Sequence, residues 1–128
     1  MKDKVTIPLM VTGGFRRREV MEHAINGGGA DVIGLGRPMC VNTDAPAQLL
    51  AGKEELIRYE DQLSLFPSWL SFLGKIGALR AIAGFAVQYW FYAQLESLGR
   101  NGVAAPDTSV FAATRQLMKS QKQWSDAR

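Results

Sequence analysis

Two glycine turns, each directly after a short apolar run, hold the residues of this 128-residue chain that are best suited to chemistry. The first turn is residues 13–16 (GGFR), and the second is residues 34–37 (GLGR). Glycine lets backbone N–H groups approach a ligand closely, and a neighbouring arginine adds a planar set of positive donors that suits phosphate oxygens. The two turns therefore indicate phosphate binding.

The apolar runs before the turns, which end at Thr12 and Ile33, have the pattern of strands. Each run is short, rich in β-branched residues and bounded by glycine, which is typical of a strand buried on both faces. A helix-length stretch lies between them, so we expect a strand, helix, strand unit with a right-handed crossover and parallel strands. Both glycine turns would then emerge at the same edge of the sheet and could form two loops of one anion site.

Three consecutive arginines lie at the start of the expected helix, which we place from about Arg16 to Asn26, with its end at the glycines 27–29. The positive end of the helix dipole disfavours cations there, and a nearby anion would reverse that penalty. A purely structural alternative exists for two of the arginines: Arg18 would pair with Glu22 one turn on, and Arg17 would be solvated. Arg16, next to the glycine turn, is the better candidate for a ligand contact.

The remaining expected elements are helical. A short helix through Leu50 would be capped by Thr43 or Asp44, with Pro46 in its first turn and Gly52 just beyond its end. Residues 66–68 (FPS) and 101–107 contain the glycine, proline and asparagine signals of chain breaks. The last segment, from Ser109 to about Lys122, has the pattern of a weakly amphipathic helix.

An aromatic helix is expected between those two breaks. It is apolar around much of its circumference and needs cover on more than one side. Its charge-free stretch, Ala81 to Leu95, has 15 residues, fewer than the roughly 20 that a membrane span requires. We expect it to pack on the outside of a larger fold, the alternatives being a subunit interface or a membrane-surface role.

The composition is that of a globular protein. An apolar fraction of 47% with 21% charged residues is enough to bury a core, and a net charge of +3 is too small and dispersed to indicate nucleic-acid binding. One cysteine excludes an internal disulfide and suits a reducing compartment. The apolar run near Met1 is too short for a signal peptide, so we expect a cytoplasmic protein.

Other chemistries lack the residues they need. Residues 34–36 (GLG) begin like a dinucleotide-binding fingerprint, but Met39 stands where the third glycine should be and Pro38 disrupts the pattern. His23 is the only histidine, so a histidine-based metal site or a serine, histidine, aspartate triad has no partners. Cys40 fits a small buried apolar residue better than a nucleophile, because no histidine is placed to activate it.

The stretch from Ile7 to Lys53 resembles the last two βα units of the flavin barrel in Old Yellow Enzyme-type NADH:flavin oxidoreductases. The likeness includes the GGFR turn, the ADVIGLGRP strand and turn, and the DAPAQLL segment, in the order that this family uses. Residues 78–99 also look like the late helix of bacterial members. The resemblance implies an α/β fold: residues 1–60 as the C-terminal part of a (β/α)8 TIM barrel, and residues 61–128 as a C-terminal helical segment packing on it.

The resemblance also implies a cofactor, FMN, whose phosphate the two turns would hold. The implied cofactor-binding residues are Gly13, Gly14, Phe15, Arg16, Gly36 and Arg37. A whole barrel takes about 250 residues, so the amino-terminal portion would be missing. In the family that portion carries the substrate-binding pair, the proton-donating tyrosine and most contacts to the flavin ring, so this chain alone is expected to lack catalytic residues.

Two functions follow as hypotheses. In the first, the chain is the C-terminal part of an FMN-dependent oxidoreductase that passes hydride from NAD(P)H through the flavin to an activated alkene or related acceptor, and this part anchors the phosphate. In the second, it is a non-catalytic phosphate-binding or assembly module, or an inactive fragment of a split gene. Two parallel strands alone leave open sheet edges, so the expected partner is either the missing N-terminal barrel portion or further copies of the chain.

Overall fold

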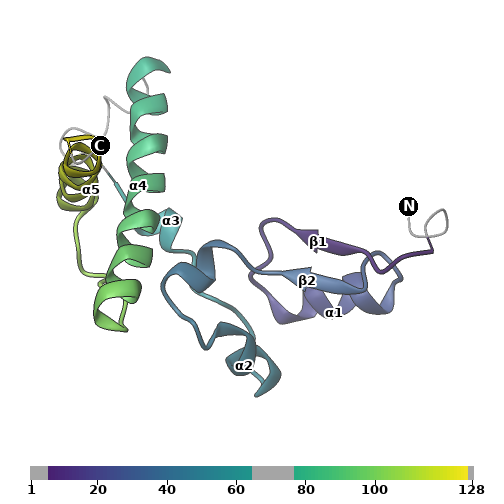
Figure 1. Ribbon diagram of the computed structural model, residues 1–128. Coiled ribbons are helices and arrows are strands. Elements are labelled where there is room, and N and C mark those ends of the chain that lie inside the picture. The colour runs from purple at the N-terminus through teal and green to yellow at the C-terminus, as the bar shows by residue number, and fades with distance from the viewer. Residues whose placement is uncertain (1–5, 65–76, 127–128) are drawn as a thin grey trace. The chain divides into compact units, whose positions relative to one another are not determined.

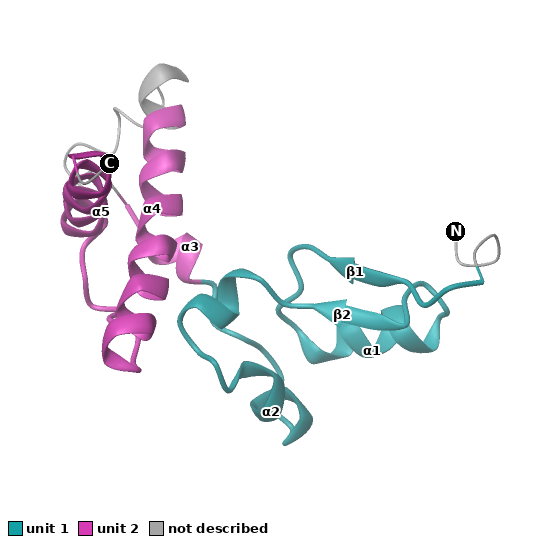
Figure 2. Ribbon diagram, in the orientation of Figure 1, with its two compact units in different colours: residues 1–58 teal, residues 59–128 magenta. Residues whose placement is uncertain are grey.

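The computed structural model describes residues 6–64 and 77–126. Their contacts divide the chain into two compact units, Met1–Arg58 and Tyr59–Arg128 (Figure 2). This division falls two residues before the boundary expected from the sequence. The first unit contains both glycine turns, and the second contains the aromatic helix.

The first unit is built on two parallel strands (Figure 1). Strand β1 spans Met10–Thr12 and strand β2 spans Val32–Gly34, and helix α1 (Arg18–Asn26) connects them. The register pairs Met10 with Val32, Val11 with Ile33 and Thr12 with Gly34. The predicted unit of strand, helix and neighbouring parallel strand is therefore confirmed.

The prediction that both strands are buried on both faces is wrong for the described residues. Met10 is 63% exposed and Val32 is 47% exposed, and Val11 is exposed as well. Burial on both faces requires a layer on each side of the sheet. Here α1 packs against β2, and the described residues of this unit place no second layer over Met10 and Val32.

Helix α1 begins two residues later than the sequence predicts, because the chain is held extended at its start. Arg17 is the N-cap, with φ −93° and ψ 130°. A later segment of the chain pairs with it: the Leu56 amide donates to the Arg16 carbonyl over 2.9 Å, and the Arg18 amide donates to the Glu54 carbonyl over 2.9 Å. The helix ends at Asn26 as predicted, and the glycine that follows its C-cap, Gly28, has φ +69°.

After β2 the chain forms two short helices. A 3-10 helix, η2 (Arg37–Cys40), follows the second turn and was not predicted. Helix α2 (Ala45–Leu50) is the expected short helix, but the expectation of a side-chain cap is wrong, because Asp44 at its N-cap makes no capping hydrogen bond. The Asn42 side chain instead accepts a hydrogen bond from the Asp44 amide over 3.2 Å.

The core of the first unit lies between α1, α2 and the segment after α2. Its buried residues are Met21, Ala45, Leu49 and Leu56, and the half-buried side chains packed against them are Phe15, Ile33, Leu35 and Met39. Two of these, Phe15 and Leu35, lie within the glycine turns themselves. The packing of this core therefore helps to fix where the turns lie.

The second unit is helical. It comprises α3 (Tyr59–Gln62), α4 (Gly77–Asn101) and α5 (Val110–Asp126), and α4 packs against α5. Both long helices were predicted. The last one was expected to end at about Lys122, and in the structure it extends to Asp126. The chain break predicted at residues 66–68 lies outside the described residues.

The loop between α4 and α5 is attached to α4 by two buried side chains. Trp90 is 0% exposed, and its indole N–H donates to the Thr108 carbonyl over 2.6 Å. The Gln94 side chain accepts a hydrogen bond from the Ala105 amide over 2.8 Å. The Trp90 ring also lies edge-on to Phe91, with ring centres 5.1 Å apart.

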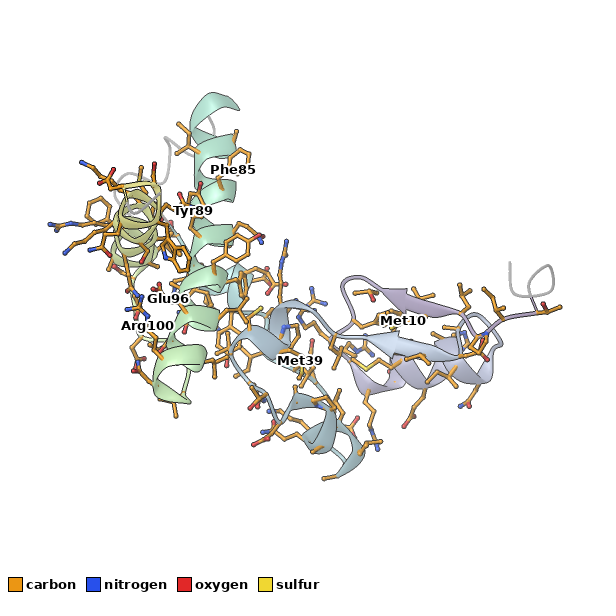
Figure 3. All side chains as sticks on the ribbon, viewed as in Figure 1. Met10, Met39, Phe85, Tyr89, Glu96 and Arg100 are labelled. Atoms are coloured by element: carbon orange, nitrogen blue, oxygen red, sulfur yellow. The ribbon has the colours of Figure 1, made fainter. Side chains whose placement is uncertain are left out.

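Helix α4 is not covered on all the sides that its sequence suggested. Ala86, Trp90 and Phe91 are buried, whereas Phe85 and Ile82 are exposed; Figure 3 labels Phe85 and Tyr89 on this helix. Among the described residues, no helix combines the length and the apolar character that crossing a membrane would require.

The strand pairing makes a prediction about Gly34. A Cβ added at Gly34 would lie 3.0 Å from the Thr12 Cβ and closer still to the Thr12 hydroxyl oxygen, so Gly34→Ala should force the two strands apart. We expect a loss of about 1–3 kcal/mol in the free energy of unfolding, measured by chemical denaturation of the whole chain.

Gly36→Ala is the matched control, because an added Cβ there meets nothing within 4 Å and the φ of Gly36 is −97°. Its stability should stay within about 0.5 kcal/mol of the original chain. Thr12→Gly removes the opposing side chain and should reduce the cost of Gly34→Ala in the double variant. An equal cost in both backgrounds would contradict the strand register.

Two tryptophans of the second unit, Trp90 and Trp124, make a second matched pair. Trp90→Ala removes a fully buried ring and leaves the Thr108 carbonyl without its donor, so it should lower the free energy of unfolding by about 3–5 kcal/mol. Trp124→Ala, at a position that is 75% exposed on α5, should change it by less than about 0.5 kcal/mol. Similar losses for both variants would refute the assigned packing of α4.

Candidate anion-binding site

Both glycine turns begin at the same edge of the sheet. Thr12 and Gly34 are paired residues at the carboxyl ends of two parallel strands, and each turn starts at or directly after its member of this pair. Parallel strands send their following loops to the same side. The pairing therefore excludes an arrangement in which the two turns leave opposite ends of the sheet.

The first turn has a backbone that requires glycine. Gly13 has φ +149° and Gly14 has φ +67°, values that side-chain-bearing residues rarely adopt. An added Cβ at either residue would meet no atom within 4 Å. The glycines are thus required by conformation and not by crowding, and the space beside the turn is open to a ligand.

A pocket of about 300 Å³ lies against this first turn. It is lined by every residue from Gly13 to Arg17, together with Val20 and Arg58. Three of these described lining residues are arginines and none is acidic. The pocket is therefore a surface where positive donors and a glycine backbone face a common space.

The three arginines at the start of α1 have different surroundings. Arg16 is only 6% exposed, and its guanidinium donates to the neighbouring Phe15 carbonyl over 2.8 Å. Burial of a guanidinium next to a glycine turn favours a defined position for its charge. Of the three, Arg16 is the one whose position the fold restricts most.

The other two arginines pair with carboxylates. Arg18 lies 3.8 Å from Glu22, as the structural alternative predicted, and 3.1 Å from Glu54. The interpretation of Arg17 as simply solvated is wrong, since it lies 2.6 Å from Glu19, although both side chains are exposed. Exposed pairs of this kind contribute little to stability.

The second turn differs from the first in its backbone. Gly36 has φ −97° and ψ −92° and forms the N-cap of η2, so a left-handed conformation does not explain the glycine. An added Cβ would meet nothing within 4 Å, and Gly36 is exposed. Arg37 follows as the first residue of η2 and is exposed. Neither Gly36 nor Arg37 is among the described residues that line the first-turn pocket.

Cys40 at the end of η2 is half-buried. Its sulfur lies 3.9 Å from the Gly36 carbonyl oxygen. Burial raises the pKa of the Cys40 thiol, while the positive charge of Arg37 and a backbone hydrogen bond lower it in part. A raised thiol pKa argues against a nucleophile, as expected from the sequence. The pKa of the Cys40 thiol therefore depends on the charge at Arg37.

The part of the chain that the structure describes contains no cluster of metal ligands. No group of three or more histidine, cysteine, aspartate or glutamate residues is placed to hold an ion there. His23 is exposed on α1, in agreement with its interpretation as a solvated helix residue.

One lining residue of the pocket was not foreseen. Arg58 reaches the first turn because residues 54–58, which we call the return segment, pair with the start of α1. The side-chain contact between Arg18 and Glu54 spans 36 residues of sequence. No local pattern in the chain indicates such a pairing, so sequence reasoning had no signal from which to find Arg58.

Comparisons with known proteins place these features in context. A curated protein of Talaromyces variabilis, named NADH-dependent flavin oxidoreductase iccE, is 30% identical over 97 residues, which are 76% of this chain and 23% of that protein. NADH-dependent flavin oxidoreductase iliE of Neonectria sp. (strain DH2) is 52% identical over 40 residues, which are 31% of this chain and 5% of that protein. The protein of the same name from Hypocrea jecorina (strain QM6a) is 40% identical over 48 residues, 38% of this chain and 12% of that protein.

No family model and no solved structure matches the chain. The chain spans less than a quarter of the length of the curated relatives it matches. Within that span it is related to proteins named as NADH-dependent flavin oxidoreductases.

Proposed function

We propose that this chain is the flavin-phosphate-binding part of an FMN-dependent NADH:flavin oxidoreductase of the Old Yellow Enzyme type, corresponding to the last two βα units of its barrel. The observation that carries the proposal is the Thr12–Gly34 pairing, from which two glycine turns with adjacent arginines leave the same sheet edge. The names of the relatives support the oxidoreductase class.

The residues at this edge fit a phosphate ester. The first turn offers the amides of Gly13, Gly14 and Phe15 beside the buried guanidinium of Arg16, and none of the described residues lining its pocket carries a negative charge. Backbone amides and arginine are the donors that hold phosphate most effectively in proteins. Gly36 and Arg37, which are both exposed, would supply the second loop.

In this proposal the chain binds and orients, and the redox chemistry belongs to the cofactor. FMN held at this sheet edge would supply the hydride-transfer chemistry between reduced nicotinamide and an acceptor such as an activated alkene. Gly13, Gly14, Phe15 and Arg16 would fix one side of the phosphate, and Gly36 and Arg37 the other. Holding the phosphate in this way restricts the position of the attached ring system, which must be aligned with both substrates. No residue of this chain is assigned a catalytic role.

A second candidate is a phosphate-binding or assembly module without catalysis of its own, or an inactive fragment. The observation that favours it is the exposure of both strands, at Met10 and Val32, in a sheet with two described strands. Such a sheet gains cover by association. If the chain alone binds FMN, the module is favoured; if FMN binds only after the amino-terminal part of a flavin barrel is added, the split oxidoreductase is favoured.

Replacing Arg37 tests the proposed phosphate site. A charge-assisted hydrogen bond to phosphate contributes about 1.5–3 kcal/mol, so Arg37→Ala should weaken FMN binding by about 10- to 100-fold, and Arg37→Lys should weaken it less. Riboflavin lacks the phosphate, so its affinity should not change. Titration of flavin fluorescence measures both ligands.

Arg100→Ala is the control for this experiment. Arg100 is an exposed arginine of the second unit that pairs with Glu96 over 2.6 Å (Figure 3), and its loss should leave FMN binding unchanged. If Arg37→Ala binds FMN as tightly as the original chain, Arg37 is not part of the phosphate site.

Cys40 provides an independent reporter of the same event. The charge of Arg37 lowers the pKa of the Cys40 thiol, so an anion bound at Arg37 should raise that pKa and decrease the thiolate fraction at a fixed neutral pH. FMN should therefore slow the alkylation of Cys40 by iodoacetamide, measured by mass spectrometry, and riboflavin should slow it less. Cys40 is the only cysteine, so the rate is unambiguous.

The Arg37→Ala variant completes the reporter experiment. Without the guanidinium, Cys40 should react more slowly in the absence of ligand, and FMN should no longer change the rate through charge. A ligand effect of equal size in this variant would mean that FMN shields the thiol by another route, and would count against a phosphate held at Arg37.

A further inference from the structure

One arginine that lines the first-turn pocket, Arg58, has no role in the proposed flavin site. Arg58 lines the pocket together with Arg16 and Arg17, although it lies about 40 residues further along the chain. The three arginine residues that line the pocket come from two separate segments, the start of α1 and the return segment. Their convergence is a property of the fold and not of a local run of arginines.

The return segment holds Arg58 in place through backbone contacts. The Leu56 amide donates to the Arg16 carbonyl over 2.9 Å, and Arg17 and Glu55 form an antiparallel bridge. The Leu56 side chain is buried in the core of the first unit at 3% exposure. Arg58 follows two residues after this anchor, so its backbone is fixed beside the first glycine turn.

The charges around the pocket favour an anion. Arg17 lies 2.6 Å from Glu19, and Arg58 lies 3.7 Å from Glu55, but neither carboxylate is among the residues lining the pocket. These side chains are about half-exposed or more, and exposed ion pairs are weak enough to rearrange around a stronger partner. A phosphate dianion would bring two negative charges into the space that the arginine residues line, whereas Glu19 and Glu55 lie outside that lining.

The pocket is also large enough for such a ligand. Its volume of about 300 Å³ is roughly ten times the share of one water molecule in the liquid. The space beside Gly13 and Gly14 is open, because an added Cβ at either residue would meet nothing within 4 Å. A tetrahedral oxyanion could therefore reach both the glycine backbone and the arginines.

We propose that Arg58, with Arg16 and Arg17, forms a binding pocket for a phosphate dianion at the first glycine turn, and that Arg58 is a specificity-determining residue for phosphorylated ligands. The identity of the ligand as the FMN phosphate rests on the proposed function. Recognition of a phosphate dianion by these three arginines does not depend on the proposed function. Free phosphate and a phosphate ester share the chemistry that the pocket recognises.

The test is calorimetric titration of the full chain with FMN, riboflavin and inorganic phosphate. Arg58→Gln should weaken FMN and inorganic phosphate by about tenfold or more, while Arg58→Lys should retain part of the affinity. Glu55→Gln removes the carboxylate that competes for Arg58 and should leave binding equal or tighter. Riboflavin affinity should be the same in all variants.

Arg100→Gln is the matched control, since Arg100 is also an exposed arginine paired with a glutamate on its own segment, in the second unit. It should bind all three ligands as the original chain does. Circular dichroism of Arg58→Gln and Glu55→Gln checks that the fold is retained. If Arg58→Gln is unfolded, a Glu55→Gln variant that is folded and binds phosphate more weakly than the original chain overturns the assignment.

The outcomes separate this inference from the proposed function. If FMN binds the original chain and Arg58→Gln equally well, Arg58 has no such role and the flavin proposal stands. If inorganic phosphate binds and is lost with Arg58→Gln, while FMN binds neither the chain alone nor the chain mixed with the amino-terminal part of a flavin barrel, the arginine pocket stands and the flavin proposal falls. If neither FMN nor inorganic phosphate binds the original chain, the arginine pocket is refuted; the flavin proposal is refuted as well if FMN also fails to bind after the amino-terminal part is added.

Discussion

The pairing of Thr12 with Gly34 is the constraint on which the candidate site depends. These residues end two parallel strands, so the turns that follow must leave the sheet at one edge. The close fit of the Thr12 side chain over Gly34 ties this geometry to one residue type, because any Cβ at Gly34 would collide with it. A local steric requirement thus sets where two remote glycine turns begin.

Much of the first unit was predictable because its signals are local. Glycines bounded the strands and ended α1 at Asn26, and the apolar runs that end at Thr12 and Ile33 gave parallel strands. Exposure of Met10 and Val32 was not predictable, since β-branched composition indicates a strand but not how many layers cover it. The capping predicted at Asp44 failed as well, because its side chain accepts no hydrogen bond from the first turn of α2.

The features that the sequence did not predict are mainly contacts between distant segments of the chain. The antiparallel bridge between Arg17 and Glu55 moves the start of α1 to Arg18 and brings Arg58 to the pocket. Neither segment has a sequence pattern that indicates this pairing. In the second unit, the burial of Trp90 against the Thr108 carbonyl likewise joins residues 18 positions apart. The candidate residues of the two turns were predicted from composition and family likeness, whereas Arg58 was found as a lining residue of the pocket only in the folded structure.

The return segment also closes a chain loop. Arg16 and Leu56 are hydrogen-bonded neighbours, so the stretch between them, which includes α1, β2 and α2, starts and ends at the same point in space. A piece of chain with adjoining ends can be cut elsewhere and rejoined with little strain. Gly52, an exposed residue at φ +106° after α2, is a natural place for new termini. The closed stretch, residues 16–56, is in this respect suited to circular permutation, with β1 left outside it.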